Sequence, residues 1–307
     1  MMAEGIKGKK CGDGVYCESW NSMFESLGGL FEWNIANRQN RLEVLLLGNK
    51  KWDIANSSVN SGEIRQERLR KISRLAHEYG MLMGADIPIA FIQQHGWAMI
   101  SLHDSIEKQR SDIQQRVDWA FNAEMDFLST EAGLSEFTKP SCELMLDLFN
   151  TFTEHVTVKW KREAYTKVHC STNEHCTEKT ETGDVKYQDP RTGDPLNFNL
   201  LPTYANGGLG VMAHTVQVYS FDDPSANAYG NSNFSYMLDY MMYEASLKSR
   251  DVLYYGETAY WVNVDVDVPL FLPLSGQRRL YDLRRAAARE IAGGYKISGQ
   301  VNFESGW

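Results

Sequence analysis

The stretch Arg41-Leu42-Glu43-Val44-Leu45-Leu46-Leu47-Gly48 is an apolar run that ends on a glycine. A run of this kind is typical of a strand buried on both faces, as in a parallel sheet covered by helices. Similar runs recur along the chain and predict strands at 14–20, 41–48, 87–94, 126–131, 164–170, 210–219, 251–257 and 295–303. Amphipathic segments between them predict helices at 22–40, 64–83, 105–122, 141–160, 234–249 and 274–293.

Strands that alternate with helices are typical of a parallel α/β protein. Eight of them in 307 residues predict one (β/α)8 TIM barrel over 1–307. The alternative is an open doubly wound parallel sheet, which usually has a glycine-rich phosphate loop after its first strand, whereas Gly12-Asp13-Gly14 comes before it. Because the chain ends at Trp307, directly after the eighth predicted strand, we expect the barrel to lack its last helix and the parent protein to be longer.

Composition limits the partners that this chain is expected to have. Hydrophobic residues at 43% and charged residues at 23% are typical of a globular protein. A net charge of -9 would repel a phosphate backbone, so we expect no nucleic acid partner. No segment has the ~20 apolar residues of a membrane span. The N-terminus lacks the apolar stretch of a signal peptide, so the compartment stays open. A secreted parent protein is one possibility, and the sequons at Asn56 and Asn233 matter only in that case.

Five cysteines cannot all pair with one another. Cys170 and Cys176 are close enough in sequence to form a small loop disulfide, and free thiols are the alternative. The segment 171–202 is the longest irregular stretch and is rich in Thr, Asp, Gly, Asn and Pro. Long ordered loops often carry function, so we expect this one to contribute to a site.

Two of the predicted strands end on a glutamate: Ser129-Thr130-Glu131 ends the fourth, and Tyr255-Gly256-Glu257 ends the seventh. Barrel enzymes place their chemistry at the C-terminal ends of the strands. Here the chain resembles the retaining glycoside hydrolases built on (β/α)8 barrels. The resemblance implies that Glu131 is the acid/base and Glu257 the nucleophile, two carboxyl groups that act together on a glycosidic bond. Thr130 stands where many of those enzymes have asparagine.

Other polar and aromatic residues lie near the same predicted strand ends and would bind a carbohydrate through hydrogen bonds and ring stacking. The predicted substrate-binding residues are Glu18, Trp20, Gln93, His95, Trp97, His169, His214, Tyr255, Trp261, Asn302 and Glu304. The resemblance implies no cofactor and no metal for this chemistry, and the sequence does not predict an oligomeric state.

Two alternatives remain open. The scattered His and Glu side chains could instead serve a divalent-metal-dependent isomerase, lyase or hydrolase, although no HxH or HExxH pair occurs. The same barrel could also bind a glycan or a protein without catalysis, because a fold does not define a function.

Overall fold

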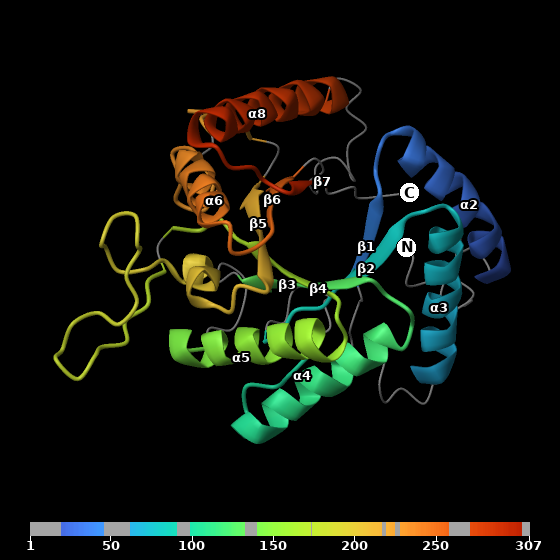
Figure 1. The fold of residues 1–307 in the computed structure, drawn as a ribbon, viewed down its shortest axis with the longest axis horizontal. Coiled ribbons are helices and arrows are strands. Elements are labelled where there is room, and N and C mark those ends of the chain that lie inside the picture. Colours follow the sequence, from blue (N-terminus) through green and yellow to red (C-terminus); the bar gives the residue numbers. More distant parts are fainter. Residues whose placement is uncertain are drawn as a thin grey trace, which may run out of the picture. The chain divides into compact units, whose positions relative to one another are not determined.

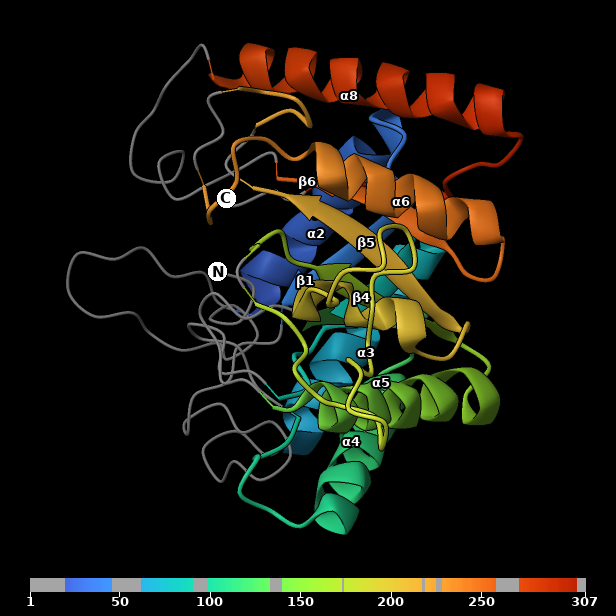
Figure 2. The same ribbon diagram turned by 90° about the vertical axis from the view of Figure 1, so that its left-hand side faces the viewer.

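The computed structural model describes residues 20–45, 62–90, 99–132, 140–172, 174–216, 219–224, 228–257 and 271–302. The chain divides into two compact units. Unit 1 comprises residues 1–130 and 154–164, and unit 2 comprises residues 131–153 and 165–307. Figure 1 and Figure 2 label the helices and strands of both units.

Unit 1 contains strand β1 (Arg41–Leu45), strand β2 (Leu82–Asp86) and the first part of β3 (Phe127–Ala132). These strands pair in parallel and in chain order, with Gly84 opposite Phe127. The helices of unit 1 are α2 (Trp20–Ala36), α3 (Gly62–Glu78), α4 (Ile106–Phe121) and the π-helical turn η1 (His155–Lys159). Helix α3 packs against β2 and α2.

Unit 2 contains most of β4 (Glu163–Val168) and all of β5 (Leu209–Thr215), β6 (Val252–Gly256) and β7 (Gly299–Asn302). Strands β5, β6 and β7 also pair in parallel and in chain order. The helices are α5 (Cys142–Glu154), the 3₁₀ segment η2 (Phe198–Tyr204), α6 (Ser235–Leu247) and α8 (Phe271–Gly293). Helix α6 packs against β5, β6 and α8, as both ribbon views show (Figures 1 and 2).

Helix α4 shows why these segments fold as the hydrophobic pattern predicts. Ser105 is its N-cap and accepts a hydrogen bond from the backbone N–H of Lys108 at 3.3 Å, which satisfies one free donor of the first turn. The side chains of Ile113, Val117 and Ala120 recur at helical spacing and are buried. The predicted helix 105–122 is therefore confirmed.

The predicted strand 87–94 and the predicted helix 64–83 are both wrong in their boundaries. Helix α3 ends at Glu78, and Gly80 turns the chain with φ +76, a value that favours glycine. The strand then begins at Leu82 and ends at Asp86. Gly84 is required within it, because a Cβ atom there would lie 2.2 Å from the ring of Phe127. This tertiary contact has no signal in the local pattern of residues 82–86.

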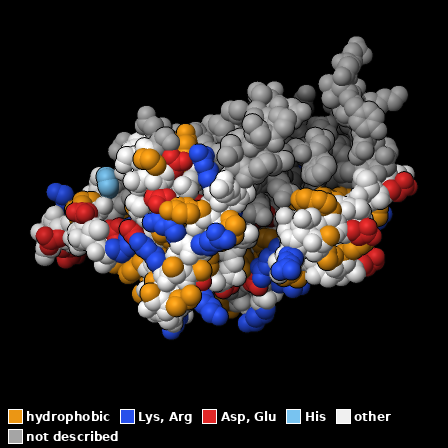
Figure 3. Space-filling view, turned by 90° about the horizontal axis from the view of Figure 1, so that it is seen from above, with side chains coloured by type: hydrophobic (Ala, Val, Ile, Leu, Met, Phe, Trp, Pro, Cys, Tyr) orange, Lys and Arg blue, Asp and Glu red, His pale blue; other side chains and the backbone are white. Residues whose placement is uncertain are grey.

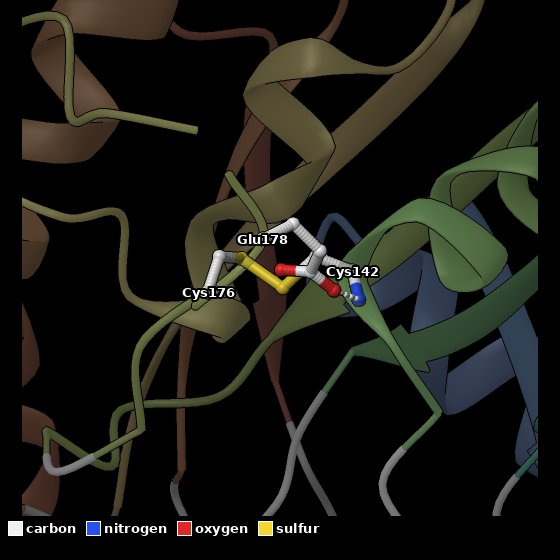
Figure 4. A group of neighbouring side chains, drawn as sticks. All are labelled: Cys142, Cys176 and Glu178. Atoms are coloured by element: carbon white, nitrogen blue, oxygen red, sulfur yellow. Dashed lines mark hydrogen bonds between the residues drawn. A yellow bond between two sulfur atoms is a disulfide. The ribbon is translucent and has the colours of Figure 1, made fainter. Parts of the chain in front are cut away.

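The irregular segment between β4 and β5 is held to the helices of unit 2. Cys176 forms a disulfide with Cys142 at the start of α5, across 34 residues of sequence. Beside it, the Glu178 carboxylate accepts the backbone N–H of Cys142 at 2.7 Å and so caps that helix (Figure 4). The predicted pairing of Cys170 with Cys176 is wrong, because the loop returns to α5 and leaves Cys170 as a buried free thiol.

The first predicted strand up to Ser19 and everything after β7 fall outside the described residues. Trp20 begins α2 and does not end a strand as predicted. Within the described part of the chain, no helix combines the length and apolar character needed to span a bilayer. Figure 3 shows acidic and basic side chains interspersed on one described face.

Candidate functional site

The two predicted carboxylates both belong to unit 2 and both lie at the C-terminal end of a strand. Glu131 is the penultimate residue of β3 and is only 6% exposed. Glu257 directly follows β6 and is half-buried. The backbone N–H of Glu257 donates to the carbonyl of Thr215 in β5 at 3.0 Å. The parallel pairing therefore continues up to the residue that carries the second carboxylate.

Strands β4, β5 and β6 bring three ring side chains together on one face. His169 follows β4, His214 lies in β5, and Tyr255 lies in β6 opposite His214 in the register. The two imidazole centroids are 5.8 Å apart, and the His214 ring is 4.5 Å from the ring of Tyr255. The edge of Tyr229 also contacts the ring of His169, at 4.8 Å between centroids. These predicted binding residues therefore form one group.

Burial keeps both imidazoles neutral at pH 7. It lowers the pKa of His169 to about 4. The pKa of His214 lies well below its usual value because of burial, with further effects of His169, Lys167 and Arg279. The backbone N–H of Ser171 donates to Nδ1 of His169 at 3.2 Å, so the ring carries its hydrogen on Nε2. His169 is thus a neutral donor at that atom.

His214 differs from His169 in its hydrogen bonding. It is 8% exposed, and among the described residues neither of its ring nitrogens has a hydrogen-bond partner. Buried polar groups in native proteins nearly always have a partner, which can be a water or a ligand. The nitrogens of His214 are therefore available to a bound molecule.

The ammonium group of Lys167 belongs to the same group of side chains. It lies 5.5 Å from the centroid of the Tyr255 ring, and the residue is 9% exposed. Lys167 and His169 are two residues apart along the β4 segment, so they share a face. Strand alternation could have identified Lys167 from the sequence, but only His169 was predicted.

The pKa of the buried Cys170 thiol is raised, and both carboxylates contribute to the shift. Burial raises its pKa well above the usual value, and the negative charges of Glu257 and Glu131 raise it further. Both carboxylates also lie at C-terminal strand ends, because Glu131 is near the end of β3 and Glu257 directly follows β6.

The backbone that follows β4 is fixed by side chains that the sequence did not reveal. The carbonyl of Cys170 accepts hydrogen bonds from Asn231, at 2.7 Å, and from the hydroxyl of Tyr236. The carbonyl of Ser171 accepts from the amides of Asn197 and Asn199 at 2.8 and 2.9 Å. These amide side chains come from the long irregular segment and from the loop after β5, and they hold the end of β4 beside His169.

Unit 1 contains one buried acidic residue that the sequence analysis missed. Asp86 is the last residue of β2 and is buried, and it pairs with Ser129 in the register of β3. The misplaced third strand hid it, since a strand predicted at 87–94 leaves Asp86 outside. A buried carboxyl group at the C-terminal end of a barrel strand is a candidate functional group.

Two further predicted residues, Trp20 and Asn302, are described by their backbone alone. The backbone of Asn302 ends β7, and Trp20 begins α2, but their side chains are not described. The other predicted residues lie outside the described residues: Glu18, Gln93, His95, Trp97, Trp261 and Glu304.

The described side chains contain one group with the spacing of metal ligands. It consists of Cys142, Cys176 and Glu178, whose ligand atoms lie within 4.8 Å of one another (Figure 4). The two sulfurs are joined in a disulfide, so they are not thiolate ligands. Within the described ranges, no second group of three such residues has this spacing, and the two imidazoles have no preformed carboxylate ligand set. The metal-dependent alternative stays a prediction.

No protein-family model matches the chain. No curated protein matches it in sequence.

Solved structures with the same arrangement of strands and helices do match. A glycoside hydrolase family 5 enzyme from Prevotella bryantii is 11% identical, has a TM-score of 0.54, and the match covers 99% of this chain and 87% of that chain. A GH138 enzyme targeting pectin rhamnogalacturonan II is 11% identical, with a TM-score of 0.50 and coverage of 96% and 33%. A sugar phosphate isomerase/epimerase from Parabacteroides distasonis is 10% identical, with a TM-score of 0.49 and coverage of 97% and 92%.

At such low identity, the two glycoside hydrolase matches show the fold alone. Within each unit the strands are parallel and in chain order, without the reversal of order that a doubly wound sheet requires. The prediction of a TIM barrel is confirmed, and the resemblance to barrel glycoside hydrolases holds at the level of architecture. This chain therefore has an α/β fold of the TIM-barrel type.

Proposed function

We propose that this chain is a carbohydrate-acting enzyme of the glycoside hydrolase type, with Glu131 and Glu257 as its two carboxyl groups. The observation that supports the proposal is that Glu131 lies at the C-terminal end of β3 and Glu257 directly follows β6, with both residues in unit 2. A pair of carboxyl groups is the essential equipment of most glycoside hydrolases. The likeness to solved barrels of that class supports the proposal by analogy of fold.

The environments of the two glutamates support different roles. Burial disfavours the charged form of a carboxyl group, and Glu131 is the more buried of the two. We assign Glu131 as the acid that donates its proton to the glycosidic oxygen while the bond to the anomeric carbon breaks. The carboxylate of Glu257 then forms a bond to that carbon, and water later displaces it with Glu131 acting as base.

The side chains around the carboxylates would bind hydroxyl groups. His169 offers a donor at Nε2, and His214 has ring nitrogens without partners in the described structure. Both rings are neutral at pH 7, which suits uncharged sugar hydroxyls. The ring of Tyr255 lies beside them and could pack against a sugar ring.

The test compares Glu131→Gln and Glu257→Gln with the wild type on a panel of nitrophenyl glycosides and plant polysaccharides. We expect turnover to fall at least about 10³-fold in both variants, since each removes a group used in bond cleavage. On dinitrophenyl glycosides, whose leaving group needs no proton, Glu131→Gln should keep much more of the rate of the first step than Glu257→Gln. Glu181→Gln is the matched control, because Glu181 is exposed on the long irregular segment.

Two results would reject the proposal. Hydrolysis at similar rates by the wild type and both variants would exclude the two-carboxylate mechanism. Binding of a glycan without any hydrolysis, unchanged in both variants, would instead favour the non-catalytic alternative.

A further inference from the structure

The guanidinium group of Arg279 lies behind β6, on the face opposite Tyr255. It comes from α8 and is buried. Its Nη2 donates to the backbone carbonyl of Glu257 at 3.0 Å, and its Nη1 donates to the hydroxyl of Tyr254. A charged group from the outer helix thus contacts the backbone of the residue that we propose as the nucleophile.

Gly256 makes this contact possible. A Cβ atom at that position would lie 1.5 Å from Nη1 of Arg279, so the guanidinium occupies the space that any other side chain would need. The backbone of Gly256 shows no positive φ, which means that close approach, and not backbone conformation, is what requires glycine here.

Asp282 holds the guanidinium from the other side. Its Oδ2 lies 3.6 Å from Nη1 of Arg279 and accepts the hydroxyl of Tyr254 at 2.6 Å. Its Oδ1 accepts the backbone N–H of Phe221 at 3.0 Å, and the ring of Phe221 packs on Tyr254 at 4.6 Å. Arg279 is therefore fixed by α8, by β6 and by the loop after β5.

The backbone of Glu257 is consequently held at both of its polar groups. Its N–H donates to Thr215 of β5, and its carbonyl accepts from Arg279 of α8. A side chain whose backbone is fixed in this way can point in fewer directions, which is the condition for a precisely oriented reacting group.

We propose that Arg279 is a positioning residue that orients Glu257 through its backbone carbonyl, and that Gly256 is glycine in order to admit it. This inference rests on the proposed role of Glu257 as nucleophile. It adds an outer helix to the set of elements that determine the reaction rate.

The experiment combines backbone hydrogen exchange by NMR with steady-state kinetics on the nitrophenyl glycoside that the wild type hydrolyses fastest. In Arg279→Gln and in Gly256→Ala, we expect exchange of the Glu257 amide to become at least about tenfold faster and kcat to fall roughly 10- to 100-fold, with KM within about threefold. The double variant should lose no more than the larger single loss, because both changes remove the same contact. Arg279→Lys, which keeps the charge, should restore part of kcat.

Arg289→Gln is the matched control on the same helix, because Arg289 pairs with Asp239 at the surface. It should leave the exchange rate and kcat at wild-type values. Gly256→Ala retains every charged group, so it tests the contact even if Arg279→Gln unfolds.

Unchanged exchange at Glu257 in both variants would overturn the positioning role, and so would faster exchange with unchanged kcat. Additive losses in the double variant would also overturn it. Failure of the proposed function has a different signature, since Glu257→Gln would then hydrolyse like the wild type. The exchange measurement would still decide whether Arg279 orders this strand end.

Discussion

Two neighbouring tyrosines of β6 face two different polar surroundings. Tyr255 lies against Lys167 and the ring of His214. Tyr254 lies on the opposite face and donates to Asp282, which in turn accepts from the backbone of Phe221. The Tyr255 side of β6, the inner face, includes the buried imidazole of His214, which has no partner among the described residues. On the Tyr254 side, the outer face, the carboxylate of Asp282 has partners at both oxygens.

Burial disfavours the charged form of ionisable side chains on both faces. Burial lowers the pKa of His169 to about 4 on the inner face. On the outer face it raises the pKa of Asp282 to about 6 and lowers that of Arg279 to about 10. A hydrogen-bonded buried network stabilises the fold, whereas a buried polar group without a partner costs stability and suggests a ligand. We therefore expect the hydrogen bonds of Asp282 to contribute to stability, and we expect His214 on the inner face to be a candidate binding group.

The largest expected effect is a loss of folding stability when Asp282 on the outer face is replaced. Asp282→Ala removes the acceptor of Tyr254 and the carboxylate that pairs with the buried guanidinium of Arg279, so the free energy of unfolding should fall by about 3–5 kcal/mol. Urea denaturation at pH 7 measures this. Asp222→Ala is the control, because Asp222 pairs with Arg285 at a partly exposed site and should cost about 0.5 kcal/mol or less. Equal losses in the two variants would mean that buried Asp282 contributes no more to the free energy of unfolding than the partly exposed Asp222.

The second prediction concerns the pH dependence of stability, because the pKa of His169 is lowered and that of Asp282 is raised. His169 has a lower pKa in the folded state than its usual 6.5, so its contribution to stability is lost as the pH falls from about 6.5 to about 4. Asp282 has a higher pKa than its usual 3.8, so its contribution is present at low pH and is lost as the pH rises through about 6. Each effect should be on the order of 3 kcal/mol.

Urea unfolding between pH 4 and pH 7 separates these two contributions. Relative to the wild type, His169→Asn should become less stable as the pH rises, and Asp282→Asn should become more stable. Slopes of the same sign for the two variants would show that burial does not act on the two faces as described.

The smallest expected change in stability is at His214. Replacement by Phe keeps a ring against Tyr255 and removes two buried nitrogens that lack partners in the described structure, so the free energy of unfolding should change by less than about 1 kcal/mol. If His214 binds a sugar hydroxyl, KM or kcat should nevertheless worsen at least about tenfold. A loss of several kcal/mol in the free energy of unfolding with normal kinetics would show that His214 has a structural role.

Local patterns predicted much of this architecture but not its contacts. Alternating apolar runs and amphipathic stretches were sufficient for most helices and for the ends of β3 and β6, because burial on both faces leaves a direct trace in sequence. The position of β2 was missed, since its strand 82–86 contains Gly84 and continues a helical pattern. Asp86 was missed for the same reason.

Pairing between distant residues was also beyond the sequence. Cys176 lies closer in sequence to Cys170 than to Cys142, yet the loop carries it to the start of α5. The amides of Asn197, Asn199 and Asn231 hold the end of β4 from loops that show no regular pattern. Spacing along a chain carries no information about which loop returns to which helix.

By itself the sequence determined the α/β alternation and the placement of Glu131 and Glu257 at strand ends, because both follow from the period of buried side chains along one element. Only the tertiary structure decided which buried polar groups on the two faces of β6 have hydrogen-bond partners. That difference depends on whether a buried polar group finds a partner on another element, as Tyr254 does in Asp282 and as His214 does not within the described residues.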